Sequence, residues 1–216
     1  MQVVPAILEN NFDTILEKLN SLEYLVSRVQ IDLCDGEMGK LITWIPEGGE
    51  TLPDDYDYEF DVMVNDWKPV VMRAIDMGVS RIVAHVDHFS EADATELIEI
   101  VEHTGTRLGV CVSNYTAIED HINFVKFFQE RYDNVFIQVM GIRDIGVQGQ
   151  PFDKEVISRI EKLREECDGV DIQVDGAMND KNAEKVHDVG AIAVVSGSYI
   201  FGGEDIAERI NEIESI

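Results

Sequence analysis

Two stretches near the end of the chain have the composition of turns that bind an anion. Gln173–Met178 and Val195–Gly202 are both apolar runs that stop abruptly at small residues. A buried strand that ends in glycine before a helix leaves backbone N–H groups free at its carboxyl end, where they can hold an anion. Two such turns in adjacent strand–helix units are the phosphate site that (β/α)8 barrels often form after their last two strands. The residues predicted to hold phosphate in these turns are Gly176, Ala177, Gly197 and Ser198.

The rest of the chain supplies the elements that such a site requires. Short apolar runs predict strands at Val3–Leu8, Val29–Leu33, Glu59–Val64, Arg81–Val86, Leu108–Ser113, Asn134–Met140, Val170–Asp175 and Ala191–Ser196. Helical periodicity predicts helices at Asn11–Leu22, Trp67–Met77, Ala92–Glu102, Thr116–Gln129, Asp153–Cys167, Lys181–Val189 and from Glu204 onward. Strands that are apolar on both faces and separated by helices indicate a parallel sheet. We therefore predict one α/β domain over residues 1–216, a (β/α)8 TIM barrel, with a long loop between the second and third strands.

Composition and charge narrow the class of function. The 216 residues are 45% hydrophobic, as expected of a globular protein, but the net charge is −26. A field of that sign repels nucleic acid and anionic membranes, so neither is expected as a partner. The acidic residues indicate a solvated surface, and adaptation to high salt is the alternative.

The cysteines and the N-terminal residues favour a cytoplasmic protein. Cys34, Cys111 and Cys167 are an odd number of widely spaced cysteines without a CxxC pair, which fits a reducing compartment. The first residues lack the basic and apolar regions of a signal peptide, and no apolar run approaches the length of a membrane span. We therefore expect a cytoplasmic location.

Polar side chains gather at the predicted carboxyl ends of the strands, where a barrel of this class has its active site. They are Gln30, Asp32, Asp35, Asp61, His85, Ser113, Asn114, Gln138 and Asp175. Asp35 precedes Gly36 and is interpreted as a turn residue. His85 either faces the pocket or is a buried structural histidine, and the sequence does not separate the two.

Six short motifs, each at a predicted strand end, resemble the ribulose-phosphate 3-epimerase family. They are Pro5-Ala-Ile-Leu8, Gln30-Ile-Asp-Leu-Cys-Asp-Gly36, Asp61-Val-Met63, Gly149-Gln-Pro-Phe152, Val174-Asp-Gly-Ala177 and Val195-Ser-Gly-Ser-Tyr-Ile-Phe-Gly202. Their order along nearly the whole chain is that of the family. The resemblance implies a phosphorylated sugar as substrate, with Gly149 among the substrate-binding or phosphate-binding residues. Met63 and Cys34 either pack over the sugar or are core residues, and the sequence does not separate the two.

The same resemblance implies a proton transfer at C3 of a ketopentose phosphate. The two acids of the family fall on Asp32 and Asp175, one removing the C3 proton and the other returning a proton from the opposite face. In the family a divalent metal polarises the C2 carbonyl and stabilises the enediolate.

The positions that match the metal ligands of the family differ from its pattern. The family uses two histidines and two aspartates, whereas this chain has Gln30, Asp32, Asp61 and Asp175. Such an oxygen-donor set favours Mg²⁺ or Mn²⁺ over Zn²⁺. The alternative is that no metal binds and that Asp61 contacts a substrate hydroxyl or supports the site.

Other departures leave the substrate open. Ala6 stands at the position of a serine in the family, and the loop after the sixth strand lacks its Asn-Pro-Gly. In that loop Arg143 either supplies positive charge to the substrate or is an exposed surface residue. The main functional prediction is an epimerase that converts ribulose 5-phosphate to xylulose 5-phosphate.

Two other functions stay open. One is a phosphosugar-binding barrel that is non-catalytic or has an altered substrate. The other is a sugar-phosphate decarboxylase, which is disfavoured because Asp61 and Asp66 have the spacing of its Asp-x-Lys-x-x-Asp array without the lysine. A homo-oligomer is possible.

Overall fold

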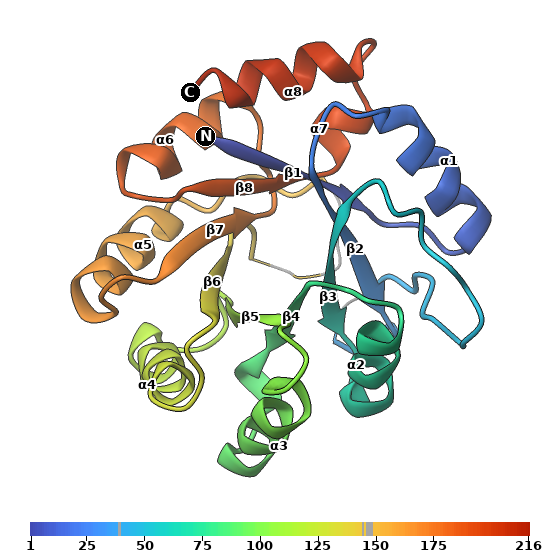
Figure 1. Cartoon of the computed structure of the whole chain (residues 1–216). Coiled ribbons are helices and arrows are strands. Elements are labelled where there is room, and N and C mark those ends of the chain that lie inside the picture. Colours follow the sequence, from blue (N-terminus) through green and yellow to red (C-terminus); the bar gives the residue numbers. More distant parts are fainter. Residues whose placement is uncertain (39, 144, 146–148) are drawn as a thin grey trace.

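The fold of the protein is seen in a computed structural model, which describes residues 1–38, 40–143, 145 and 149–216. Eight parallel strands close into a barrel in the order of the sequence, from β1 to β8, and β8 pairs with β1. Figure 1 looks into the barrel and shows the helices as an outer ring. The predicted (β/α)8 TIM barrel is therefore confirmed.

The boundaries of the elements follow the predicted ones closely. The strands are β1 (Gln2–Ile7), β2 (Arg28–Cys34), β3 (Asp57–Met63), β4 (Arg81–His85), β5 (Arg107–Val112), β6 (Val135–Met140), β7 (Asp171–Asp175) and β8 (Ala193–Ser196). The α-helices are α1 (Phe12–Leu22), α2 (Trp67–Asp76), α3 (Glu91–Val101), α4 (Ile118–Gln129), α5 (Glu155–Glu166), α6 (Asp180–Asp188), α7 (Ser198–Phe201) and α8 (Ile206–Glu214). Two short elements were not predicted, the 3₁₀ helix η1 (Val86–His88) and α7. Between β2 and β3 no helix forms in the described residues, as expected.

The side chains of each strand alternate between the outside and the inside of the barrel. Outward residues such as Ile31, Phe60 and Ile82 are completely or almost completely buried and belong to the large apolar cluster that includes the helices. Inward residues form a smaller apolar cluster that includes Val83 and Phe136. The remaining inward positions are polar, so this barrel encloses a set of buried hydrogen-bonding groups.

Gly109 on β5 makes room for one large side chain inside the barrel. A Cβ atom at this position would lie 2.5 Å from Cζ of Phe136 and 2.9 Å from a methyl group of Val83. The Phe136 ring, completely buried, therefore occupies the volume that a side chain on β5 would otherwise fill.

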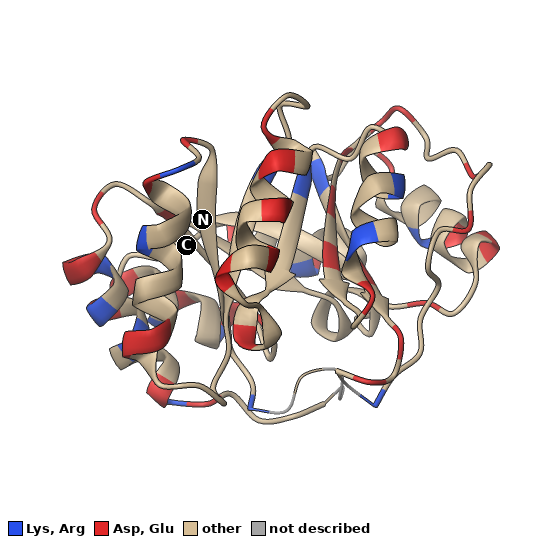
Figure 2. Ribbon diagram, turned by 90° about the horizontal axis from the view of Figure 1, so that it is seen from below, with Lys and Arg blue, Asp and Glu red and all other residues tan. Residues whose placement is uncertain are grey.

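The two ends of the chain lie side by side on the outside of the barrel (Figure 1), and the amino group of Met1 is 3.5 Å from the carbonyl oxygen of Glu214. Figure 2 shows acidic residues on helices and loops all around the barrel, as the net charge requires. Among the residues described here, no helix has the length and apolar character needed to cross a membrane.

Substitution of Gly109 by alanine should overpack the barrel interior. We expect Gly109→Ala to lower the free energy of unfolding by about 1–3 kcal/mol, because the new methyl group meets the rigid Phe136 ring. Chemical denaturation measures the change. Gly203→Ala is the control, since its added Cβ would meet the flexible Arg209 side chain. Equal stability of the two variants would contradict this account of the interior.

Candidate active site

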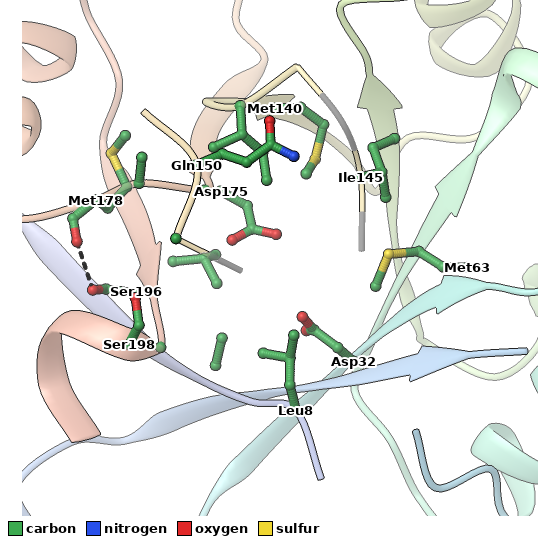
Figure 3. A pocket seen from close by; sticks show the side chains of 17 residues that line it. Leu8, Asp32, Met63, Met140, Ile145, Gln150, Asp175, Met178, Ser196 and Ser198 are labelled. Atoms are coloured by element: carbon green, nitrogen blue, oxygen red, sulfur yellow. Dashed lines mark hydrogen bonds between the residues drawn. The ribbon is translucent and has the colours of Figure 1, made fainter. Parts of the chain in front are cut away.

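A pocket of about 110 Å³ opens at the carboxyl ends of the strands. Its walls come from strands far apart in sequence, and they include Ala6, Asp32, Met63, Asp175 and Ser196. Figure 3 shows that the carboxyl groups of Asp32 and Asp175 both point into this pocket, from β2 and β7. The two residues predicted as acid and base are therefore brought together by the closure of the barrel.

Burial and mutual repulsion make these two carboxyl groups hard to ionise. Burial raises the pKa of Asp32 well above its usual value of 3.8, and the charges of Asp175 and Asp61 raise it further. Burial, together with the charge of Asp61, raises the pKa of Asp175 to about 8. Because two close carboxylates cannot both ionise easily, the pair holds a proton at neutral pH.

The third carboxylate of the site, Asp61, has partners that neutralise it. One of its oxygens lies 2.7 Å from Nε2 of His85, and the other accepts a hydrogen bond of 2.8 Å from the Gln138 amide. Burial opposes the protonation of His85, but Cys111 and Asp61 raise its pKa well above 6.5. Since burial keeps the Cys111 thiol protonated by raising its pKa to about 11, the carboxylate of Asp61 is the partner that counts. His85 thus lies inside the barrel, where it pairs with Asp61 and is 2% exposed.

Among the four residues predicted as metal ligands, Gln30 and Asp61 have protein hydrogen-bond partners in this structure. Gln30 turns its amide N–H toward Asp32, which accepts a hydrogen bond of 2.8 Å, and Asp61 is engaged by His85 and Gln138. Within the described residues, no three His, Cys, Asp or Glu side chains are placed to hold a metal ion. Among the described residues, Oε1 of Gln30 is a buried acceptor without a donor, as is Oδ1 of Asn114. A metal would require both Gln30 and Asp61 to exchange their present partners.

The predicted phosphate turns line the same pocket from the side opposite Met63. Gly176 and Ala177 have positive φ angles of 105° and 56°, a conformation that is rare for alanine and common near functional sites. Gly197 passes so close to β1 that a Cβ atom would lie 2.9 Å from the carbonyl oxygen of Ala6. Ser198 and Gly149 complete this side of the lining. The turns and the two acids therefore share one cavity.

Other residues named from the sequence lie outside the pocket. Asp35 is a turn residue, as interpreted, because its carboxylate accepts hydrogen bonds from the backbone N–H groups of Glu37 and Asn65 at 2.8 and 2.7 Å. Arg143 is exposed and is not among the described residues that line the pocket. Ser113 binds Asp87 with a hydrogen bond of 2.8 Å.

A column of hydrogen bonds beneath the acids was not predicted. Gln138 accepts a hydrogen bond of 2.7 Å from Gln173, which also donates to Glu59 at 2.6 Å. Arg81 in turn donates to Glu59 and to Gln173. Polar residues spaced two apart in otherwise apolar strands are the signal that could have identified these inward positions.

A TIM barrel in which two carboxyl groups with raised pKa values line one pocket with two phosphate-type turns has the kind of site found in enzymes that act on sugar phosphates. The family model described as "Ribulose-phosphate 3 epimerase family" matches residues 2–201. The chain belongs to the ribulose-phosphate 3-epimerase family, as its motifs indicated.

Relatives agree with this assignment over almost the full length. The chloroplastic ribulose-5-phosphate-3-epimerase of Arabidopsis thaliana is 28% identical, with 99% of this chain and 76% of the relative covered. The ribulose-phosphate 3-epimerase of Synechocystis is 26% identical, with 96% and 90% covered. Among solved structures, KGPDC from Streptococcus mutans in complex with D-R5P has a TM-score of 0.72 at 12% identity, covering 99% and 95% of the two chains. At that identity the structural likeness shows the fold alone.

The pKa of Asp175 predicts how its removal changes stability. In the unfolded chain this group ionises near pH 3.8, but in the folded protein only near pH 8, so it lowers stability increasingly as the pH rises through that window. We expect Asp175→Asn to raise the free energy of unfolding at pH 8 by on the order of 2 kcal/mol relative to its effect at pH 4. Urea denaturation at both pH values measures this.

Asp87 provides the matched contrast. Burial opposes its ionisation, but hydrogen bonds from His121, Thr116 and Ser113 hold its pKa below the usual value. Its stabilising contribution is present above pH 4 and is lost as the pH falls through the lowered pKa. Asp87→Asn should therefore destabilise the protein at pH 8. If Asp175→Asn, like Asp87→Asn, showed no gain in stability at pH 8 relative to pH 4, the raised pKa of Asp175 would be wrong.

Proposed function

We propose that this protein epimerises C3 of a ketopentose 5-phosphate, interconverting ribulose 5-phosphate and xylulose 5-phosphate. The observation that carries the proposal is the pair of carboxyl groups of Asp32 and Asp175, which line one pocket and both have raised pKa values. The family match and the names of the relatives support the choice of reaction and substrate.

A pair that holds one proton has one base and one acid ready at neutral pH. The ionised carboxylate removes the proton from C3, and the electrons of the broken C–H bond form an enediolate across C2 and C3. The protonated carboxyl then delivers its proton to C3 from the opposite face. Each turnover thus exchanges the protonation states of Asp32 and Asp175, and the reverse reaction starts from the exchanged state.

The surroundings keep this pair in the state that the reaction needs. The apolar side chains of Leu8, Met63, Met140 and Ile145 line the pocket with the two acids (Figure 3) and limit the access of water. Low polarity keeps both pKa values high and strengthens the electrostatic interactions of the bound intermediate. The pairing of Asp61 with His85 reduces the electrostatic repulsion between the Asp61 carboxylate and the negatively charged enediolate.

The turns bind the substrate phosphate in this proposal, since glycine-rich backbone at strand ends is a general anion site. Gly149, Gly176, Ala177, Gly197 and Ser198 form the phosphate end in this proposal, and Met63 packs over the sugar. The position of Met63 also argues against decarboxylation, because it stands where the Asp-x-Lys-x-x-Asp array has its lysine.

Hydrogen exchange at C3 tests the roles of the two acids. In D₂O, the wild type should introduce deuterium at C3 of ribulose 5-phosphate, as measured by NMR or mass spectrometry. Asp32→Asn and Asp175→Asn should each lower the rate at which deuterium-labelled xylulose 5-phosphate forms by at least about 100-fold, since inversion at C3 needs both proton carriers. Asp57→Asn, an exposed aspartate at the opposite end of β3, is the control and should keep the wild-type rate. A folded wild type that binds the sugar phosphate without exchange would leave a binding barrel instead.

Removal of metal ions tests the role of the oxygen donors. We expect C3 exchange to survive treatment with EDTA, because Asp61 is already neutralised by His85 and Gln30 presents its N–H to Asp32. Exchange that stops with EDTA and returns with Mg²⁺ or Mn²⁺, more than with Zn²⁺, would instead establish the ligand set Gln30, Asp32, Asp61 and Asp175 predicted from the sequence.

A further inference from the structure

Three arginines converge at the end of the barrel opposite to the active site. Arg28, Arg81 and Arg107 are the first residues of β2, β4 and β5, and they are the Lys or Arg residues that the described strands contain. Because parallel strands all begin at the same end of a barrel, three cations meet at one place in a chain of net charge −26. They line a cavity of about 210 Å³ together with Phe136, Asp171 and Gln173.

The carboxylates of this cavity do not balance the three arginines. Glu59 pairs with Arg81, and Asp171 pairs with Arg107 at 2.6 Å. Arg28 has no hydrogen bond or ion pair with any described residue, and its Nε is buried without an acceptor. The cavity thus carries an excess of one positive charge.

A second buried donor in the cavity also lacks a partner. Nε of Arg107 makes no hydrogen bond within the described residues, although the terminal nitrogen of the same side chain binds Asp171. Buried N–H groups without acceptors are rare in folded proteins, because each costs about 1–3 kcal/mol. Two such donors on guanidinium groups that line one cavity are the arrangement that a multidentate anion satisfies.

Like charges at close range give independent support for an anion. Burial lowers the pKa of Arg81, and the charges of Arg28 and Arg107 lower it further, so the three guanidinium groups repel one another. Arg81 is held in place from both sides, since it stacks 3.8 Å above the centre of the Phe136 ring and bonds to Glu59 and Gln173. Arg28 and Arg107 are half-buried, so the cavity is accessible from solvent.

We propose that this cavity is a binding site for a small tetrahedral oxyanion, with Arg28 and Arg107 as the donors and Arg81 as a fixed positive charge. The ligand chemistry is that of phosphate, either free or as the phosphate group of a small metabolite. The site is separate from the pocket that Gly176, Ala177, Gly197 and Ser198 line at the other end of the strands, because the two cavities share no lining residue.

The N–H resonances of the arginine Nε groups test the site directly. In ¹H–¹⁵N spectra, titration with inorganic phosphate should shift the Nε–H signals of Arg28 and Arg107 and reach saturation, while chloride at equal ionic strength should not. Arg28→Gln should weaken phosphate binding, followed at Arg107, by about tenfold, the loss expected for one charge-assisted hydrogen bond. Arg131→Gln, an exposed residue with the same change in charge, is the matched control and should bind as the wild type does.

Each outcome decides the proposal. A parallel titration with glucose 6-phosphate tells whether the site prefers free phosphate or the phosphate group of a metabolite. The preferred ligand should saturate the Nε–H shifts at the lower concentration. Signals that do not saturate, that respond equally to chloride, or that keep the same affinity in Arg28→Gln would overturn the site and leave a cavity filled by water. None of these readings depends on the activity at the opposite end of the barrel.

Discussion

A carboxylate removed from water has to be paired, hydrogen-bonded or protonated, and this requirement governs the interior of the barrel. Glu59 is paired with Arg81, and Asp61 is held by His85 and Gln138. Asp32 and Asp175 lack a cation of their own, and so burial and repulsion leave them with raised pKa values. This difference in partners separates Glu59 and Asp61 from Asp32 and Asp175, the pair that we propose as acid and base.

The hydrogen-bonded column of Arg81, Glu59, Gln173, Gln138 and Asp61 replaces the apolar layers that usually fill a TIM barrel. Buried ion pairs contribute little net stability, since desolvation offsets most of their attraction. The column instead fixes the orientation of Asp61 below the two acids, because each of its side chains has hydrogen-bond partners. Apolar packing against the helices then has to stabilise the fold as a whole, and the continuous cluster of outward strand residues and helices provides it.

The sequence predicted the barrel because each strand is a buried, continuous apolar run, a signal that depends on local residues alone. It also predicted which strand ends carry Asp32, Asp61 and Asp175, since parallel strands bring their carboxyl ends together. The pairings inside the barrel could not be predicted in this way, because Arg81 and Gln173 are 92 residues apart and Glu59 and Gln173 are 114 apart. Their contact depends on barrel closure and register, which no local pattern specifies. The short helix α7 was missed for a related reason: its four residues are too few to show a helical period.

The groups without protein partners mark the two ends of the barrel. At the carboxyl ends of the strands, Oε1 of Gln30 is a buried acceptor without a donor beside two protonatable acids. At the opposite end, Nε of Arg28 and of Arg107 are buried donors without acceptors. A folded chain tolerates such atoms where a ligand or water forms the hydrogen bond that the protein does not. An unpaired acceptor needs a donor as its partner, and an unpaired donor needs an acceptor. The acceptor-rich end suits a proton or a hydroxyl group of a sugar, and the donor-rich end suits an anion. The same closed barrel therefore separates two opposite electrostatic environments, with the satisfied column of hydrogen bonds between them.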